Sequence, residues 1–338
     1  MDAEADRCLV YLGQHADDGP VYDPSQSHRT LEAYSDSDWS VGHSTSGYAL
    51  LYCGAVVAYG SKRQHSVALS STEAEIYAAS LAAAEIIYHR GLLREMGADV
   101  SEPTVLHVDN KGAIALGKDS KSCQRSRHIE RRYLKLREWV AMGEIVLEYI
   151  ETTRNPADLL TKTLDAATFA RHASFLFGTA HAVSDAAPVP DVQQRTFDVD
   201  AAYLKGEFES PITLYARPPR GARHYVDGVP VVWRLRVPLY GEADAGRLWN
   251  RTLVRFLTGS VDGGGAGWTQ SLYDPCYFFK ILSDGSRMHL VMYVDDGYVV
   301  DSSGALADVE LKRIHDRFTI NIKPARFFLG NNISVGAP

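Results

Sequence analysis

The pattern of hydrophobic and polar positions divides the first part of the chain into strands and one long helix. Three short hydrophobic runs of the strand type come first, at 31–40, 47–54 and 55–62. An Ala-rich segment at 70–97 then predicts a helix. Ser70 and Glu73 form a capping box at its start, and Gly97 stands where a helix ends. The order predicts a sheet covered by a helix.

The next segments continue the alternation. Residues 103–110 predict a strand that ends in Asp109, and 144–152 predict another strand. Between them, hydrophobic residues recur at helical spacing and predict an amphipathic helix closed by Gly143, at Ile129, Tyr133, Leu136 and Val140. Asn155 followed by Pro156 predicts an N-cap and a first helical position, which places Asp158 in the first turn of a helix running to residue 162.

A second unit follows a small, Pro-containing stretch without periodicity. Strands are predicted at 196–204, 212–218 and 231–239. Helices are predicted at 246–257 and 305–318, and a strand, turn and strand at 276–300 with a further turn at 295–297. The predicted domains are an N-terminal remnant of a preceding segment, a first domain, a linker and a second domain, at 1–30, 31–178, 179–195 and 196–335.

Composition excludes several classes of protein. The chain has 338 residues, 45% hydrophobic and 23% charged, which is typical of folded globular domains. Its four cysteines are scattered without metal-ligand spacing, so neither a zinc site nor a disulfide framework is predicted. No targeting signal and no membrane-spanning run is recognised.

The net charge of −7 means that any nucleic-acid binding must come from a local basic patch. Residues 118–137 supply one, because their arginines and lysines outnumber the acids. The alternative interpretation is a solvated helix face.

Four carboxylates, Asp36, Glu75, Asp109 and Asp158, lie at strand ends and helix starts along the first domain. Paired divalent ions about 4 Å apart, as used in phosphodiester hydrolysis, need such oxygen ligands. Crowded carboxylates repel one another unless cations neutralise them, so a structural role for the whole set is disfavoured. Taken singly, each residue is better explained as a turn, surface or helix N-terminal charge, and the functional interpretation rests on the set.

The segments SKRQHSVALSSTEAEIYA and RSRHIERRYLKLRE, with YSDSDW, VDNKGAI and NPADLLTK, resemble the RNase H domain of copia-type LTR retrotransposon polyproteins over about residues 31–175. The resemblance implies an RNase H-like mixed sheet flanked by helices, in the mixed α/β (α+β) class. It also implies two Mg²⁺ ions, with Mn²⁺ as a substitute, held by Asp36, Glu75, Asp109 and Asp158. Asp38 and Glu73 are the neighbours most easily confused with these ligands.

The resemblance further implies that basic residues follow the backbone of an RNA:DNA hybrid, namely Arg127, His128, Arg131, Arg132 and Lys135. For His128, a packed or capping histidine is the favoured alternative. ETTRNPAD lacks the histidine that related cellular enzymes often carry before the last aspartate, so we expect product release to rely on other groups or turnover to be slow.

DVDAAYLKGEF, SLYDPCYFF and LVMYVDDGYVV resemble the reverse transcriptase palm of the same elements over about residues 196–333. This implies an incomplete palm with an antiparallel sheet, in which Asp198, Asp295 and Asp296 hold two Mg²⁺ ions and Tyr203 packs under the nucleotide sugar. Asp200 is the alternative to Asp198. A plain turn is the alternative for the DDG sequence.

Three departures from the family predict an impaired polymerase. The fingers segment before Asp198 is absent, GEADAGR places Asp244 and Gly246 where the family has Gln and Pro, and the two domains follow in reverse order. We therefore expect an Mg²⁺-dependent RNase H acting on RNA:DNA hybrids beside a truncated palm. The alternative is a catalytically dead, nucleic-acid-binding remnant. Expected partners are hybrid, template-primer and other retroelement Pol chains, in a cytoplasmic particle or the nucleus.

Overall fold

The computed structural model describes residues 18–23, 30–40, 42–118, 130–179, 193–209, 213–283, 285–301 and 306–333, with the side chains of 130–133 excluded. The chain divides into an N-terminal unit, Met1–Arg94 with Ala98–Val189 and Pro338, and a C-terminal unit, Glu95–Gly97 with Pro190–Ala337. The predicted remnant at 1–30 and linker at 179–195 lie mostly outside the described residues.

A five-stranded mixed sheet forms the centre of the N-terminal unit, in the order β3-β2-β1-β4-β5. Its strands are β1 (Glu32–Asp38), β2 (Thr45–Tyr52), β3 (Ala55–Arg63), β4 (Thr104–Val108) and β5 (Ile145–Tyr149). The first three pair antiparallel, whereas β4 runs parallel to β1 and to β5. The mixed α/β class predicted from the sequence is thereby confirmed.

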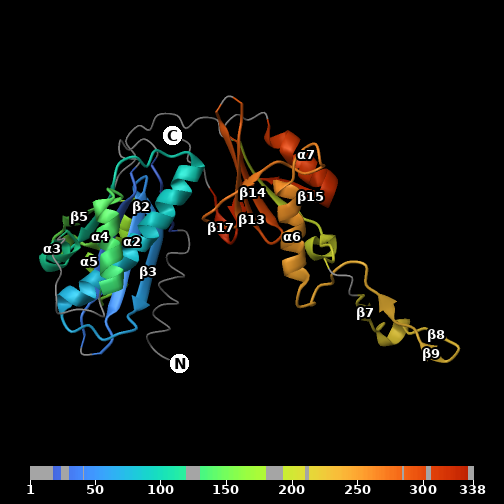
Figure 1. Ribbon diagram of the computed structural model, residues 1–338, viewed down its shortest axis with the longest axis horizontal. Helices are drawn as coiled ribbons and strands as arrows, with labels where there is room; N and C mark the ends of the chain where they lie inside the picture. Colours follow the sequence, from blue (N-terminus) through green and yellow to red (C-terminus); the bar gives the residue numbers. More distant parts are fainter. Residues whose placement is uncertain are drawn as a thin grey trace. The chain divides into compact units, whose positions relative to one another are not determined.

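Helices cover both faces of this sheet (Figure 1). On one face the core joins β-strand residues such as Ala33 and Leu106 to helices α2 (Ser71–Met96), α3 (Lys111–Lys118) and α4 (Glu130–Ala141). On the other face Tyr34 packs with a smaller cluster that includes Ala157 and Leu176. Those two residues belong to the 3-10 helix η2 (Pro156–Leu160) and to α5 (Ala166–Leu176). Successive residues of β1 therefore serve opposite layers, as strand alternation requires.

Helix α2 begins at the predicted capping box. The Ser70 hydroxyl accepts a hydrogen bond from the Glu73 amide at 3.1 Å, and the Glu73 carboxylate accepts one from the Leu69 amide at 2.8 Å. Small side chains such as Ala79 and Ala83 let the helix lie close to the sheet with almost no exposed surface. The capping bonds fix where the helix starts and hence which residues face the sheet.

The segment around Asp158 differs from the sequence prediction. Asn155 does cap it, accepting a hydrogen bond from the Ala157 amide, but the helix is a short 3-10 turn rather than a longer α-helix. The side chains of Thr161 and Lys162 bond to Asp36 and hold the segment against β1, which leaves little length for α-helical turns. Another 3-10 turn, η1 (Thr152–Arg154), precedes it, and α5 was not predicted.

The C-terminal unit contains a six-stranded antiparallel sheet in the order β11-β12-β13-β14-β6-β15. The strands are β6 (Gln193–Val199), β11 (Thr269–Gln270), β12 (Tyr277–Ile281), β13 (Arg287–Tyr293), β14 (Asp296–Asp301) and β15 (Ile320–Pro324). Helices α6 (Ala245–Thr258) and α7 (Ala307–Phe318) supply Trp249, Leu257 and Phe318 to the core beneath it. The predicted antiparallel sheet is confirmed.

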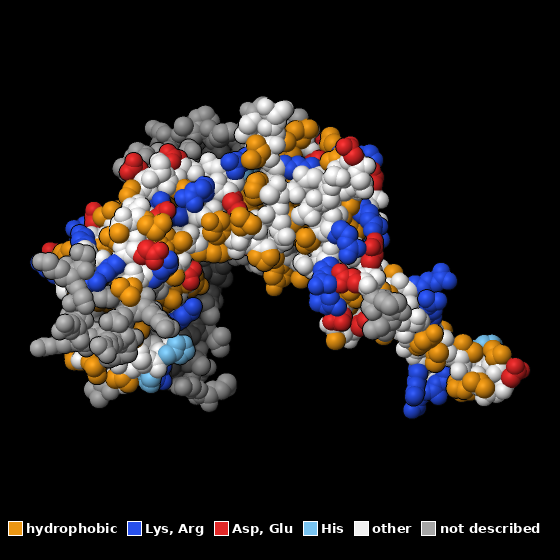
Figure 2. All heavy atoms as spheres, viewed as in Figure 1, with side chains coloured by type: hydrophobic (Ala, Val, Ile, Leu, Met, Phe, Trp, Pro, Cys, Tyr) orange, Lys and Arg blue, Asp and Glu red, His pale blue; other side chains and the backbone are white. Residues whose placement is uncertain are grey.

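Residues 212–239 form shorter strands than predicted. Among the described residues of this stretch, the strand pairs are β7 (Tyr215–Ala216) with β10 (Trp233–Arg234), and β8 (Tyr225–Val226) with β9 (Val229–Pro230). Many of their hydrophobic side chains are exposed, and Figure 2 shows them at the surface beside basic groups. A last short pair joins β16 (Phe327–Phe328) to β17 (Asn331–Asn332). Within the described ranges, no helix has both the length and the hydropathy needed to cross a bilayer.

Gly47 on β2 leaves room for η2 against the sheet. It pairs with Asp36 in the register, and a Cβ atom there would lie 2.7 Å from Thr161 Cγ2 and 2.9 Å from Leu160 Cβ. Gly47→Ala is expected to lower the free energy of unfolding of the N-terminal unit by about 1–3 kcal/mol, because the added methyl overpacks this contact. Urea denaturation followed by hydrogen exchange in β2 measures the loss.

Gly42→Ala is the matched control, since a Cβ at Gly42 meets nothing within 4 Å. Its stability should stay within about 0.5 kcal/mol of the parent. Equal stabilities for the two variants would contradict the proposed close packing of η2 on β2.

Candidate metal centre

Asp36 lies on the central strand of the N-terminal sheet and is fully buried. Strand β1 is buried along most of its length although it carries polar residues on both faces, with Ser35 and Ser37 on one face and Asp36 on the other. Polar groups in such a strand cost free energy unless they are bonded or charge-compensated. Asp36 accepts hydrogen bonds from the Thr161 hydroxyl and from Lys162 Nζ, the latter at 3.0 Å.

Asp109 follows the parallel neighbour of β1. The register pairs Ser35 with Val108, so the residues that come next, Asp36 and Asp109, lie side by side where the pairing of β1 with β4 ends. One oxygen of the Asp109 carboxylate accepts a hydrogen bond from the Thr152 hydroxyl at 2.8 Å. Burial raises the pKa of Asp109, and the charge of Asp36 adds to the effect.

Asp158 reaches the same place from η2. Asn155, which is fully buried, caps this turn and donates a hydrogen bond to the Ser35 carbonyl at 2.9 Å, so the turn is tied to the central strand. Burial, followed by the charge of Asp36, raises the pKa of Asp158 to about 6.

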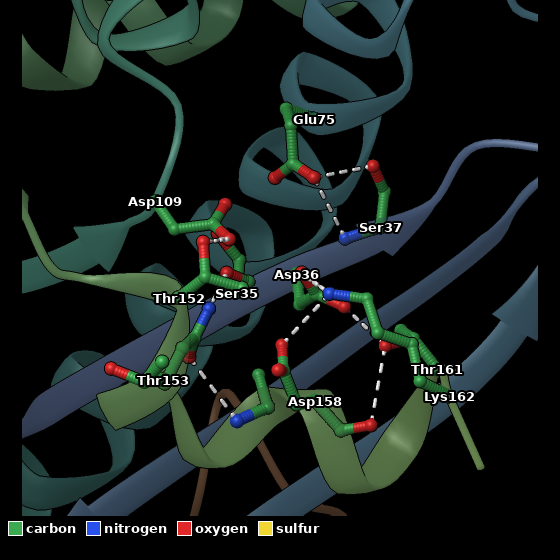
Figure 3. Close-up of polar contacts among 12 residues, drawn as sticks. Ser35, Asp36, Ser37, Glu75, Asp109, Thr152, Thr153, Asp158, Thr161 and Lys162 are labelled. Atoms are coloured by element: carbon green, nitrogen blue, oxygen red, sulfur yellow. Dashed lines mark hydrogen bonds and ion pairs between the residues drawn. The ribbon is translucent and has the colours of Figure 1, made fainter. Parts of the chain in front are cut away.

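These three aspartates converge. Each offers a carboxylate oxygen, and the three oxygens lie within 4.8 Å of one another (Figure 3). Their mutual repulsion is unfavourable in a buried position, which is the electrostatic condition that a bound cation relieves. In the described ranges this is the one acidic group with metal-binding spacing.

Glu75 stands on α2, across the sheet from η2. Its Oε1 accepts hydrogen bonds from the Ser37 amide at 3.0 Å and the Ser37 hydroxyl at 2.6 Å. Its Oε2 is buried and has no hydrogen-bond partner in the described part of the chain, and Figure 3 shows it on the side facing Asp109. Burial raises the pKa of Glu75 to about 8, and the charges of Asp109 and Asp36 contribute.

Alternation along β1 explains why Glu75 stands apart from the three aspartates. Ser37 faces α2, whereas Asp36 faces η2, so Glu75 approaches from the α2 side while Asp36 and Asp158 lie on the η2 side. A buried carboxylate oxygen without a partner, beside three converging carboxylates, has the hard oxygen chemistry that divalent Mg²⁺ or Mn²⁺ accepts. The residues therefore fit a divalent cation.

The near neighbours of these acids have other roles. The Glu73 carboxylate is engaged in the α2 cap. Asp38 ends β1 and does not belong to the converging group. Sequence reasoning missed Ser37, Thr152 and Lys162, which hold the site's acids. The four-residue spacing from Asp158 to Lys162 was a usable signal for an ion pair.

The predicted nucleic-acid-binding residues are only partly described. Arg127 and His128 lie outside the described residues, and Arg131 and Arg132 belong to α4 without described side chains. Lys135 is exposed on α4, where it pairs with Glu138 at 3.0 Å and lies over the Trp139 ring.

The second predicted acidic set lies at one end of the C-terminal sheet. Asp198 on β6 pairs in register with Asp296 on β14, and the Asp295 carbonyl accepts a hydrogen bond from the Val199 amide at 2.9 Å. The tight turn consists of Val294 and Asp295, so Asp296 belongs to the strand rather than to the turn predicted at 295–297.

The acids of the second set do not form a compact cluster. Among the described residues they are not gathered within the 4.8 Å that joins the first three aspartates. Partial burial raises the pKa of Asp296, with further contributions from Asp295 and Asp198. Trp249, which sequence reasoning missed, donates a hydrogen bond from its indole to the Val294 carbonyl at 2.6 Å and so fixes this turn.

Tyr203 lies in the 3-10 helix η3 (Ala202–Lys205), half-buried, with its ring centroid 4.8 Å from that of Tyr240. Asp244, which stands where the family has Gln, lies at the start of α6 and forms an ion pair with Arg247 at 3.2 Å. The Arg247 hydrogen bond and charge lower the pKa of Asp244. Arg247 thus offsets part of its negative charge.

Comparison with known proteins bears on both units. The retrovirus-related Pol polyprotein from transposon TNT 1-94 of Nicotiana tabacum is 37% identical over 138 residues, covering 40% of this chain and 10% of that protein. The corresponding polyprotein from transposon RE2 of Arabidopsis thaliana is 33% identical over 167 residues, covering 48% and 11%. The chain therefore spans about a tenth of the length of these curated relatives.

Among solved structures, the N-terminal RNase H domain of rv2228c from Mycobacterium tuberculosis, fused to maltose binding protein, covers 44% of this chain and 98% of its own, with 13% identity and a TM-score of 0.32. Superposition this weak does not define a fold, which rests instead on the strand order above.

Residues 167–337 match the family model described as Reverse transcriptase (RNA-dependent DNA polymerase). The match takes in half of the chain, including all six strands of the antiparallel sheet and the three acids at its end. Together with the similarity to the plant polyproteins, this confirms the expected relationship. The chain belongs to the reverse transcriptase (RNA-dependent DNA polymerase) family and is a segment of a copia-type retrotransposon Pol polyprotein.

Proposed function

We propose that the N-terminal unit cleaves the RNA strand of RNA:DNA hybrids with the help of divalent cations, Mg²⁺ in the first place and Mn²⁺ as a substitute. The observation that carries this proposal is the convergence of Asp36, Asp109 and Asp158 within 4.8 Å, beside the unpartnered buried oxygen of Glu75. Four carboxylates are enough to hold two such ions.

Magnesium bound by these carboxylates would supply the positive charge that activates an attacking water and stabilises the departing oxygen of the phosphodiester. The protein supplies the positioning. Ser37 orients the Glu75 carboxylate through two hydrogen bonds, and Thr152 orients that of Asp109 through one. Side chains held in this way lose less freedom when the substrate and ions bind.

The substrate assignment comes from the family resemblance. Arg127, His128, Arg131, Arg132 and Lys135 would contact hybrid phosphates without reading sequence, while the 2'-hydroxyl distinguishes the RNA strand. Asn155 and Thr161, which hold η2 in place, would act as positioning residues because they fix Asp158 and Asp36.

For the C-terminal unit we propose template-primer binding with impaired nucleotidyl transfer. Asp198 and Asp296 face each other in register, as a polymerase metal site requires, and Asp295 adjoins them. Asp244, at the start of α6, would put a negative charge where the family resemblance places contacts to an incoming nucleotide. Tyr203 would lie under the sugar of that nucleotide.

Asp109→Asn is expected to reduce Mg²⁺-dependent cleavage of a labelled RNA:DNA hybrid at least about 100-fold, because the amide removes one ligand charge from the centre. The full chain is incubated with hybrid, and cleavage products are quantified by gel electrophoresis. Asp99→Asn, a change at an exposed loop residue, is the matched control and should cleave like the parent. Hybrid binding without cleavage by the parent would favour a non-catalytic, nucleic-acid-binding remnant.

The raised pKa of Glu75 predicts a pH dependence of stability. Without metal, the folded protein retains a proton on Glu75 up to about pH 8, whereas the unfolded chain releases it near 4.5. This contribution to stability is fully present below pH 4.5 and is lost as the pH rises through 8. Hydrogen exchange in β1 should therefore be faster at pH 9 than at pH 6 after correction for the intrinsic rate.

Added Mg²⁺ should remove most of that difference, because it binds the deprotonated carboxylates. Glu75→Gln should make metal-free exchange in β1 nearly independent of pH between 6 and 9, since the amide does not titrate there. An unchanged pH dependence in this variant would assign the effect to another group.

A further inference from the structure

Lys162 lies in the acidic site between Asp36 and Asp158. Its Nζ lies 3.0 Å from Asp36 Oδ1 and 3.0 Å from Asp158 Oδ1, so one ammonium bridges two of the three converging aspartates (Figure 3). The side chains of Asp36 and Asp158 are 1% and 8% exposed. Their pairing with Lys162 therefore takes place largely out of water, where charge compensation matters most.

The Lys162 ammonium neutralises the acidic site in the way that a bound metal cation would. The three carboxylate oxygens lie within 4.8 Å of one another, and the ammonium neutralises part of their charge while satisfying two of their lone pairs. Asp36 and Asp158 raise the pKa of Lys162 more than burial lowers it, which keeps the ammonium charged. The metal-free protein thus has a positive charge of its own at the site.

The same oxygens cannot serve the ammonium and a divalent ion equally well. Asp36 Oδ1 and Asp158 Oδ1 are the atoms that Lys162 contacts, and they belong to the group suited to metal binding. A divalent ion on these ligands would also repel a positive charge at hydrogen-bond distance.

The Lys162 side chain can move out of the acidic site into solvent. Its side chain is 33% exposed, whereas the two carboxylates are buried. A lysine side chain is a flexible four-carbon stem with a strongly hydrated head, so the ammonium can exchange its carboxylate contacts for water by rotation about side-chain bonds. Asp158 and Thr161 are held by the capped η2 turn, so the backbone need not move.

We propose that Lys162 is a resident counter-ion of the metal-free site, which a divalent cation must displace in order to bind. The inference rests on the proposed metal-dependent function and deepens it. Lys162 stabilises the metal-free acidic site. The apparent affinity for metal equals the intrinsic affinity multiplied by the fraction of molecules in which Lys162 is unpaired. It is a positioning residue rather than a catalytic one.

Lys162→Met tests the proposal, with Lys62→Met on an exposed part of β3 as the matched control. Calorimetric titration of the full chain with MgCl₂, and separately with MnCl₂, gives the dissociation constants. Loss of the competing ammonium should tighten binding about tenfold if the paired state holds roughly nine-tenths of the parent population. The metal-free melting temperature should fall in Lys162→Met only.

A second measurement uses the unmodified protein and so does not depend on the variant's folding. Lysines are acetylated briefly with and without MgCl₂, and labelling is quantified by mass spectrometry. Release of the ammonium should raise labelling of Lys162 severalfold in MgCl₂ and leave that of Lys62 unchanged.

The outcomes separate this inference from the proposed function. Equal or weaker metal binding by Lys162→Met, or labelling of Lys162 that MgCl₂ does not increase, would overturn the counter-ion role while leaving the metal centre intact. Failure of both the parent and the variant to bind either cation would remove the metal centre itself, and with it the counter-ion role.

Discussion

The N-terminal unit depends on the burial of Asp36 in the middle of its sheet. A carboxylate placed there is unfavourable unless other groups compensate its charge and bond its oxygens. Lys162 and Thr161 do both, and they reach Asp36 only because the η2 turn lies against β1 and β2. The close approach of that turn requires glycine at position 47. One buried acid therefore constrains the packing of three elements.

The alternation of side chains along β1 brings the acidic residues of the N-terminal unit together. Asp36 points to the η2 side and Ser37 to the α2 side, so a single strand organises acids from both helical layers. The parallel pairing of β1 with β4 brings Asp109 to the same edge. The contacts of Ser37 with Glu75, and of Asp36 with Thr161 and Lys162, connect β1 to its two neighbouring layers, which is why polar residues lie where a core strand would otherwise be hydrophobic.

Much of this arrangement could be predicted from the sequence, because local signals are strong where they rest on backbone chemistry. The Ser70 and Glu73 cap, the Asn155 cap and the strand ending at Asp109 all follow from short-range rules. Ser37 was missed because its partner Glu75 lies 38 positions away in the chain. Lys162 bonds Asp36, 126 positions away, and only its pairing with Asp158 four positions earlier had a local signal. The strands predicted between 212 and 239 were too long, since many hydrophobic residues there remain exposed in two-stranded pairs instead of joining the six-stranded sheet.

The acidic sets of the two units differ in burial, and only the buried set is in direct contact with a lysine among the described residues. Asp198, Asp295 and Asp296 are partly exposed, and water can screen their repulsion while their strands keep them adjacent. Burial and the neighbouring acids raise the pKa of Asp296, and the charge of Lys323 offsets part of this rise. Asp36 and Asp158 lack that access to water, so a direct ammonium contact takes the place of screening. The two acidic sites should therefore differ in their response to dissolved salt. The repulsion among Asp198, Asp295 and Asp296 should weaken as ionic strength rises. The buried pair of Asp36 and Asp158, which Lys162 neutralises, should respond mainly to a cation that displaces the lysine.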